Sequence, residues 1–312
     1  MHDIRHWRDF LHYFQSASYT QKFLRRCYRS MPGSDVKSYD NCYPFMYYLE
    51  QGEIYYKQAE DSPLSIKPIL LFYGFIHFIK AVVLTTDPNY PETTTVLAHG
   101  ITSRKRKKQQ YRFLHDEVKI QKNGLFTHFS SLHFDLKHLE GEKYKMEDLL
   151  DQIPEMADSF SVLMKKTTMF PFTEGRLSIE ENLLNHFHWT PDSFRQHHSS
   201  LPEGIHWEGQ DTLSTTLRNE ALPFRWNRQE RKLALPAIKN EASSLPEVLI
   251  HYAILYNLSM IARYETEWWM ELLKNRTTED YPFILAFITL TTEKGPSLLG
   301  ELLENKMKQE GE

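Results

Sequence analysis

The chain has 312 residues, of which 41% are hydrophobic and 25% are charged, and its formal net charge at pH 7 is -4. This composition predicts a packed globular protein and excludes global disorder and a strong overall field that attracts nucleic acid or anionic membranes. The two cysteines, Cys27 and Cys42, are too few for a disulfide framework or a zinc site. Because the first residues also lack the apolar run of a signal peptide, we expect a cytoplasmic protein.

The first third of the chain has the apolar spacing of helices. Two short helices are expected between residues 4 and 29, and a longer, tyrosine-rich helix is expected from about Pro44 to Glu60. The next helix covers residues 66–84, with Pro68 in its first turn. This segment also contains Lys67, His77 and Lys80, so we predict a buried core helix and no membrane span.

The pattern changes after a proline-containing loop at residues 85–95. Apolar and polar residues alternate from Glu117 and end on Asn123-Gly124, which predicts a small β-hairpin near 117–127. A short helix is expected at about 146–153, and residues 165–240 show no sustained helical period and suit short strands near 205–207 and 222–226. Two long helices are expected at 245–274 and 281–308, the second interrupted near Gly295-Pro296.

These elements predict a mainly α fold with a small β part (α+β), built as a helical bundle similar to HEPN domains with an irregular or β middle region. We expect two subdomains, because one core rarely grows beyond roughly 250 to 300 residues. The N-terminal subdomain, residues 1–155, would hold the first helices and the hairpin. The C-terminal subdomain, residues 156–312, would hold the irregular segment and the long helices.

A basic segment is the most conspicuous functional feature of the chain. His99 and Gly100 precede Ser103, and Arg104 and Lys105 begin a run of five basic residues that ends at Lys108. Glycine lets backbone amides approach a ligand, serine donates to phosphate, and arginine and lysine supply charge, so the segment suits a polyphosphate. Two alternatives stay open: a solvated basic loop and a non-specific contact with RNA.

Two helices carry further candidate binding residues. Tyr73, His77 and Lys80 are spaced by four and three residues, so they share one stripe that either lines a ligand pocket or forms the solvated edge of the helix. Arg263 in the last third either pairs with Glu267 one turn away or binds a ligand as a free cation. No metal-ligand spacing, phosphate loop, dinucleotide fingerprint or serine-nucleophile motif is present, so we expect no metal site, no cofactor and no catalytic site.

The chain resembles the YaaC-like family of Firmicutes. The segments that carry the resemblance are Lys67 to Gly74, Lys80-Ala81, Leu97 to Gly100, Val118 to Phe126 and Leu258 to Tyr264 followed by Trp268. Members of this family are often encoded beside IMP dehydrogenase, which implies that enzyme as a partner. The resemblance and the basic segment together suggest a non-catalytic regulatory protein that binds a purine polyphosphate nucleotide, such as ppGpp or pppGpp, and controls IMP dehydrogenase by direct binding.

The expected ligand-binding residues combine the basic segment with the helix stripe; they are Lys67, Tyr73, His77, Lys80, His99, Gly100, Ser103, Arg104, Lys105 and Arg263. One alternative function is a HEPN-type ribonuclease, because Arg5 and His12 fit the spacing of that active site. A second alternative is a protein-protein adaptor that needs no ligand. We expect neither a membrane nor DNA as a partner, and the oligomeric state stays open, a homo-oligomer included.

Overall fold

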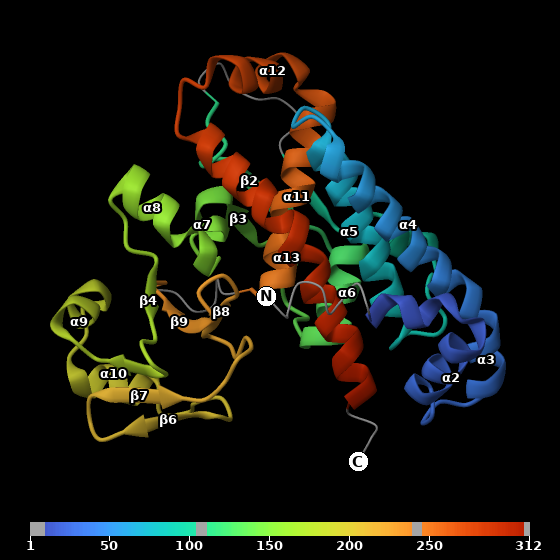
Figure 1. Ribbon diagram of the computed structural model, residues 1–312, viewed down its shortest axis with the longest axis horizontal. Coiled ribbons are helices and arrows are strands. Elements are labelled where there is room, and N and C mark those ends of the chain that lie inside the picture. The colour runs from blue at the N-terminus through green and yellow to red at the C-terminus, as the bar shows by residue number, and fades with distance from the viewer. Residues whose placement is uncertain (1–9, 104–110, 239–244, 309–312) are drawn as a thin grey trace. The chain divides into compact units, whose positions relative to one another are not determined.

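The protein is described by a computed structural model, which covers residues 10–103, 111–238 and 245–308 (Figure 1). The described chain is mainly helical, with 57% helix and 12% strand, which confirms the expected α+β class. Two compact units are present. The core unit contains the chain up to Met146 and again from Glu247, and the inserted unit contains Glu147 to Pro246.

This division differs from the expected boundary at 155 and 156. The long C-terminal helices belong to the same unit as the N-terminal helices, because their apolar faces pack on residues 67–84 and share one core with them. The middle of the chain is therefore an insertion into the core unit and does not form one subdomain with the C-terminal helices.

The core unit is built mainly from helices, with one small sheet. Its elements are η1 (Tyr13–Gln15), α2 (Ala17–Cys27), α3 (Ser34–Asp40), α4 (Cys42–Asp61), α5 (Lys67–Leu84), η2 (Thr94–Leu97), β1 (Ile101–Ser103), β2 (Glu117–Ile120), α6 (Leu125–Phe134), β3 (Lys143–Lys145), α11 (Glu247–Tyr264), α12 (Thr266–Asn275) and α13 (Asp280–Lys308). The strands form an antiparallel sheet in the order β1-β2-β3.

Helix α5 is the centre of the core unit, and it packs on α4, α11 and α13. Two glycines bring α4 and α5 together: a Cβ on Gly52 would lie 2.6 Å from the Phe78 ring, and one on Gly74 would lie 2.7 Å from the Tyr56 ring. In the described chain, α5 is the one helix long and apolar enough to cross a membrane, but 67% of it is buried inside the unit. This burial is that of a core helix, as the sequence predicts.

The expected β-hairpin at 117–127 is wrong. Strand β2 ends at Ile120, pairs with β1 and β3, and the Asn123-Gly124 step leads into α6. Gly124 has φ 133° and ψ 178°, and a Cβ there would lie 2.3 Å from the Gly100 nitrogen. Gly124 is therefore required because two loops approach closely where α6 starts. An Asn-Gly step also occurs in tight hairpin turns, so the local sequence does not distinguish the two structures.

The two C-terminal helices also differ from their predicted forms. The expected helix at 245–274 is divided at Glu265, whose backbone leaves the helical region with φ -117° and ψ 46°. The expected interruption near Gly295-Pro296 is absent, because α13 runs through Pro296. Both residues are buried in α13, where the side chains around them hold the helix in place.

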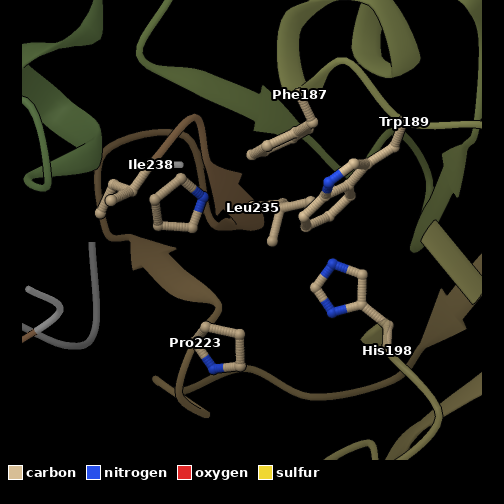
Figure 2. Close-up of a pocket in the computed structure, with 7 residues that line it drawn as sticks. Phe187, Trp189, His198, Pro223, Leu235 and Ile238 are labelled. Carbon is tan, nitrogen blue, oxygen red and sulfur yellow. The ribbon is translucent and has the colours of Figure 1, made fainter. Parts of the chain in front are cut away.

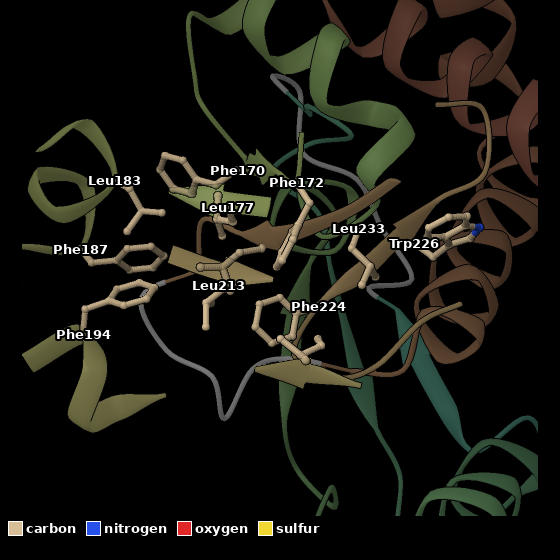
Figure 3. Packing of buried hydrophobic residues seen from close by; sticks show 12 residues of the cluster. Phe170, Phe172, Leu177, Leu183, Phe187, Phe194, Leu213, Phe224, Trp226 and Leu233 are labelled. Atoms are coloured by element: carbon tan, nitrogen blue, oxygen red, sulfur yellow. The ribbon is translucent and has the colours of Figure 1, made fainter. Parts of the chain in front are cut away.

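The inserted unit contains two antiparallel three-stranded sheets and short helices. Its elements are α7 (Met146–Leu150, which begins at the boundary), η3 (Pro154–Met156), α8 (Ala157–Met164), β4 (Met169–Pro171), β5 (Arg176–Ser178), α9 (Glu181–Phe187), α10 (Pro191–His197), β6 (Ile205–Glu208), β7 (Thr212–Thr215), β8 (Arg225–Asn227) and β9 (Lys232–Pro236). The sheet orders are β4-β9-β8 and β5-β7-β6. Figure 3 shows its core, where Leu183, Phe187 and Phe194 from the helices converge on apolar strand residues.

Candidate functional site

Four aromatic side chains from α4 and α5 alternate across the interface between these helices, and we call them the aromatic ladder. Tyr55 stacks on Tyr73 with ring centroids 6.1 Å apart and on His77 at 5.6 Å, and Tyr48 follows His77 at 6.0 Å. Tyr48 and Tyr55 are seven residues apart on α4, or about two helical turns, so they fall on the same side of the helix. The predicted stripe of α5 therefore faces a matching stripe on α4.

A cation lies at each end of the ladder. The Lys80 ammonium lies 5.6 Å from the centroid of the Tyr48 ring, and the Arg263 guanidinium lies 5.6 Å from that of Tyr73. Arg263 also donates to the Tyr73 hydroxyl at 3.0 Å and to the Ser259 carbonyl at 3.1 Å. These contacts fix the direction of the guanidinium.

Neither cation has an acidic partner within the described residues. The expected pairing of Arg263 with Glu267 does not form, because α11 ends at Tyr264 and Glu267 lies on the next helix. Burial lowers the pKa of Lys80 from its usual value. Both charges are thus half-buried and without a neutralising carboxylate, which is a costly state unless an anion binds.

His99 joins the ladder from the loop after η2. Its carbonyl accepts hydrogen bonds from the Tyr252 hydroxyl at 2.8 Å and the Phe126 amide at 3.1 Å, and its ring lies 5.7 Å from that of Tyr256. Burial, followed by the charges of Arg263 and Lys80, lowers the pKa of His99 to about 4. The imidazole is therefore neutral at pH 7.

His77 is also neutral at pH 7 and presents an unsatisfied nitrogen. Burial and the nearby Lys80 charge lower its pKa, and its buried Nδ1 has no hydrogen-bond partner in the described chain. The hydroxyls of Tyr48 and Tyr55 likewise have no hydrogen-bond partner among the residues that the structure describes. Three members of the ladder, Tyr48, Tyr55 and His77, thus carry a hydrogen-bonding atom that no described residue satisfies.

Five of the residues predicted from the sequence lie close together in the structure: Tyr73, His77, Lys80, His99 and Arg263. The candidate residues predicted from the sequence do not include the tyrosines found around them, which are Tyr48, Tyr55, Tyr90, Tyr252 and Tyr256. The signal was the tyrosine content of the 44–60 helix, which gave no direction for the individual side chains. Tyr90 is 5% exposed, and its hydroxyl has no partner in the described chain.

The remaining predicted residues do not join the ladder. Lys67 lies at the start of α5, and its ammonium donates to the Glu60 carbonyl at 3.1 Å. Gly100 serves the close approach to Gly124. Ser103 pairs with Val118 in the sheet, and its buried hydroxyl has no partner in the described chain. Arg104 and Lys105 lie outside the described residues.

A second cluster of charges is fully enclosed in the core unit. The Glu247 carboxylate lies 2.5 Å from the Lys294 ammonium and 3.3 Å from His251 Nε2, and His251 Nδ1 lies 2.7 Å from the Thr291 hydroxyl. Burial raises the pKa of Glu247, but Lys294 and His251 outweigh burial and hold it at about 2. With 2% or less of each charged side chain exposed, this cluster is a structural ion pair and is closed to ligands.

The inserted unit has a small aromatic recess, shown in Figure 2. Phe187, Trp189 and His198 surround Leu235, with Pro223 at one side. The recess has room for about one water molecule, and its lining contains no lysine, arginine, aspartate or glutamate.

The ladder and the two cations beside it offer hydrogen-bond donors and positive charge. Lysine, arginine and tyrosine donate hydrogen bonds, and neutral imidazoles donate from one nitrogen. In the described part of the chain, no carboxylate pairs with Lys80 or Arg263. Phosphate groups supply matching acceptor oxygens and negative charge.

The family model of the YaaC-like proteins matches residues 12–303. A search of curated proteins and a search of solved structures each found no match. The matched range includes the aromatic ladder, His99 and both cations. The chain therefore belongs to the YaaC-like family.

Proposed function

We propose that this protein is a regulatory protein without catalytic activity, and that its aromatic ladder binds a purine polyphosphate nucleotide. The observation that carries the proposal is the pair of half-buried cations, Lys80 and Arg263, which have no acidic partner in the described chain and flank a row of unused donors. A cation held in this way costs free energy in the empty protein, and an anionic ligand removes that cost.

An exposed aromatic ring beside Arg263 could also hold the base of a nucleotide. Tyr264 is 65% exposed, and the Arg263 guanidinium lies 5.2 Å from its ring centroid. An exposed ring beside a cation can stack on a base while the cation binds phosphate. Guanosine tetra- or pentaphosphate is the proposed ligand.

The test is calorimetric titration with guanosine tetraphosphate at constant salt concentration. Each charge-assisted contact contributes about 1.5 to 3 kcal/mol. The variants Lys80→Met and Arg263→Met should therefore each weaken binding roughly tenfold to a hundredfold. Lys67→Met is the matched control, because Lys67 lies on the same helix but away from the ladder. Absence of binding to the wild type, or full affinity in both ladder variants, would overturn the proposal.

The proposed partner is IMP dehydrogenase, and the proposed location is the cytoplasm. The family association suggests this partner, and the ladder supplies a place where a nucleotide can control the interaction. Dehydrogenase binding should change when guanosine tetraphosphate is added, and Arg263→Met should remove that change. Binding that is identical with and without nucleotide would instead support a ligand-independent adaptor.

A HEPN-type ribonuclease is the competing function. His12 is exposed at the start of η1, and its proposed partner Arg5 lies outside the described residues. Cleavage of labelled RNA by the wild type, lost in His12→Ala and retained in Arg263→Met, would favour the ribonuclease over nucleotide regulation.

A further inference from the structure

Exposed hydrophobic side chains are concentrated on the outer side of α3 and α4. Five of the fourteen large hydrophobic residues that are exposed in the described chain belong to these two helices, and they are Val36, Tyr39, Tyr43, Tyr47 and Ile54. Their exposed fractions run from 44% to 67%. Figure 1 shows α4 at the outside of the core unit, beside α5, so the aromatic ladder lies on the inner side of α4. A concentration of this kind on the outer side indicates an interaction surface.

The outer side of α4 has the residue spacing of a helix that pairs with a second helix. Exposed residues follow one another there at alternating steps of four and three, and they are Tyr43, Tyr47, Glu50, Ile54 and Lys57. This spacing places one continuous row of side chains on a single helix face, as in coiled coils. We call this row the α4 seam. The rings of Tyr43 and Tyr47 lie 6.0 Å apart, so the seam begins with adjacent aromatic rings.

Asp40, the last residue of α3, extends the seam by one step, because the backbone stays nearly helical between α3 and α4. The Asn41 amide donates to the Lys37 carbonyl at 3.0 Å, and the Phe45 amide donates to the Asn41 carbonyl at 3.0 Å. Asp40 and Lys57 therefore lie at opposite ends of the extended seam. Neither side chain has an ion-pair partner in the part of the chain that the structure describes.

The extended seam is complementary to itself in one antiparallel register. When two copies of the seam are related by a two-fold axis, Tyr43 of one copy can face Ile54 of the other while Asp40 faces Lys57, and each contact occurs twice. A shift of seven residues in one direction places Asp40 against Glu50, which is a like-charge contact, and the opposite shift leaves Asp40 beyond the end of α4. A parallel pair would place Asp40 against Asp40 and Lys57 against Lys57. The charges therefore favour this antiparallel register.

We propose that the outer side of α3 and α4 is a dimerisation surface, on which the same surface of a second copy of this chain packs antiparallel about a two-fold axis. Such a dimer removes the tyrosine rings and Ile54 from water, and burial of apolar surface drives association. Tyrosine is also enriched at protein interfaces. The pairing of Asp40 with Lys57 fixes the register, since like charges across an interface disfavour the alternatives. The seam contains no residue of the ladder, so this inference does not rest on nucleotide binding.

Sedimentation equilibrium of the full-length protein measures the dissociation constant of the dimer. The wild type should be dimeric, and Ile54→Ser should weaken the dimer by roughly tenfold or more, because an apolar contact is lost twice. Leu285→Ser is the matched control, since Leu285 is 41% exposed, close to the 44% of Ile54, but lies on α13. A wild type that stays monomeric at its highest soluble concentration overturns the proposal, and so does equal weakening by the two serine variants.

Exchange of the two end charges tests the register. Asp40→Lys and Lys57→Asp each create two like-charge contacts in the homodimer, so each variant alone should dimerise roughly tenfold more weakly or worse. In an equimolar mixture of the two variants, opposite charges meet again at both contacts, and a heterodimer of nearly wild-type affinity should form. Both positions are exposed, and thermal melts check that each variant is folded. Unchanged dimerisation of both single variants, or no heterodimer in the mixture, overturns the antiparallel pairing.

Discussion

Replacement of Glu247 by glutamine should destabilise the core unit strongly. The Glu247 carboxylate lies 2.5 Å from the Lys294 ammonium, and the two side chains are 1% and 2% exposed. Glutamine keeps the shape of the side chain but removes the charge, so the buried Lys294 ammonium loses this carboxylate. Removing one partner of a buried ion pair costs about 3 to 5 kcal/mol, out of a total stability of about 5 to 15 kcal/mol for a typical domain.

Urea unfolding followed by circular dichroism measures this loss, because helices dominate the core unit. The double variant Glu247→Leu with Lys294→Met removes both charges and should recover most of the stability, since apolar replacement of a buried pair is often neutral or stabilising. A glutamine variant that loses less than about 1 kcal/mol would refute the reasoning, since that is the size of an exposed pair.

The Glu247–Lys294 pair also predicts that the wild-type protein loses stability at acidic pH. The pKa of Glu247 is lowered from 4.5 to about 2, because Lys294 and His251 favour the carboxylate despite its burial. A lowered pKa contributes stability that is complete above pH 4.5 and is lost as the pH falls from 4.5 towards 2. The glutamine variant should lack this part of the pH dependence, and an unchanged acid profile would contradict the assignment.

Two further predictions concern the loop that holds His99. The pKa of His99, about 4, should rise when a polyphosphate binds beside the ring, so nucleotide affinity should increase as the pH falls from neutral towards 4. In calorimetry, His99→Gln should reduce that increase. Equal dependence of affinity on pH in the wild type and the variant would contradict this prediction. Gly124→Ala should lower the thermal midpoint and weaken nucleotide binding, because a Cβ there lies 2.3 Å from the Gly100 nitrogen. Gly141→Ala is the control, since its φ is also positive but nothing lies within 4 Å, and equal shifts for the two would show that backbone conformation alone matters.

The helical periodicity of α5 was sufficient to predict half of the ladder. Tyr73, His77 and Lys80 share a stripe by spacing alone, and the structure confirms that they do. The other half depends on the rotation of α4 about its axis, which is set by the close contacts at Gly52 and Gly74. Arg263 lies 190 residues from Tyr73 in the chain, so no local pattern can reveal that contact.

Local signals failed where one short sequence serves two backbone geometries. Asn123-Gly124 satisfies a tight hairpin turn, but here the glycine starts a helix against Gly100, and the choice is made by contacts across the fold. The inserted unit posed a related difficulty, because its strands have three to five residues each and few alternations to detect. The predicted subdomain boundary at 155 and 156 assumed that each subdomain is one continuous segment. The core unit instead contains two segments that are distant in the sequence.

Local charge density is one sequence signal for an anion site, and burial of single cations is another. The basic run from Arg104 to Lys108 lies outside the described residues, whereas Lys80 and Arg263 lie within them. Lys80 and Arg263 are single basic residues within largely apolar helices, and it is this position that makes them candidates in the sequence. Half-burial beside aromatic rings weakens the screening of each charge by water, and neither cation pairs with a carboxylate among the residues that the structure describes. At the proposed site, a phosphate would therefore interact with each cation at a lower effective dielectric than with a fully solvated cation.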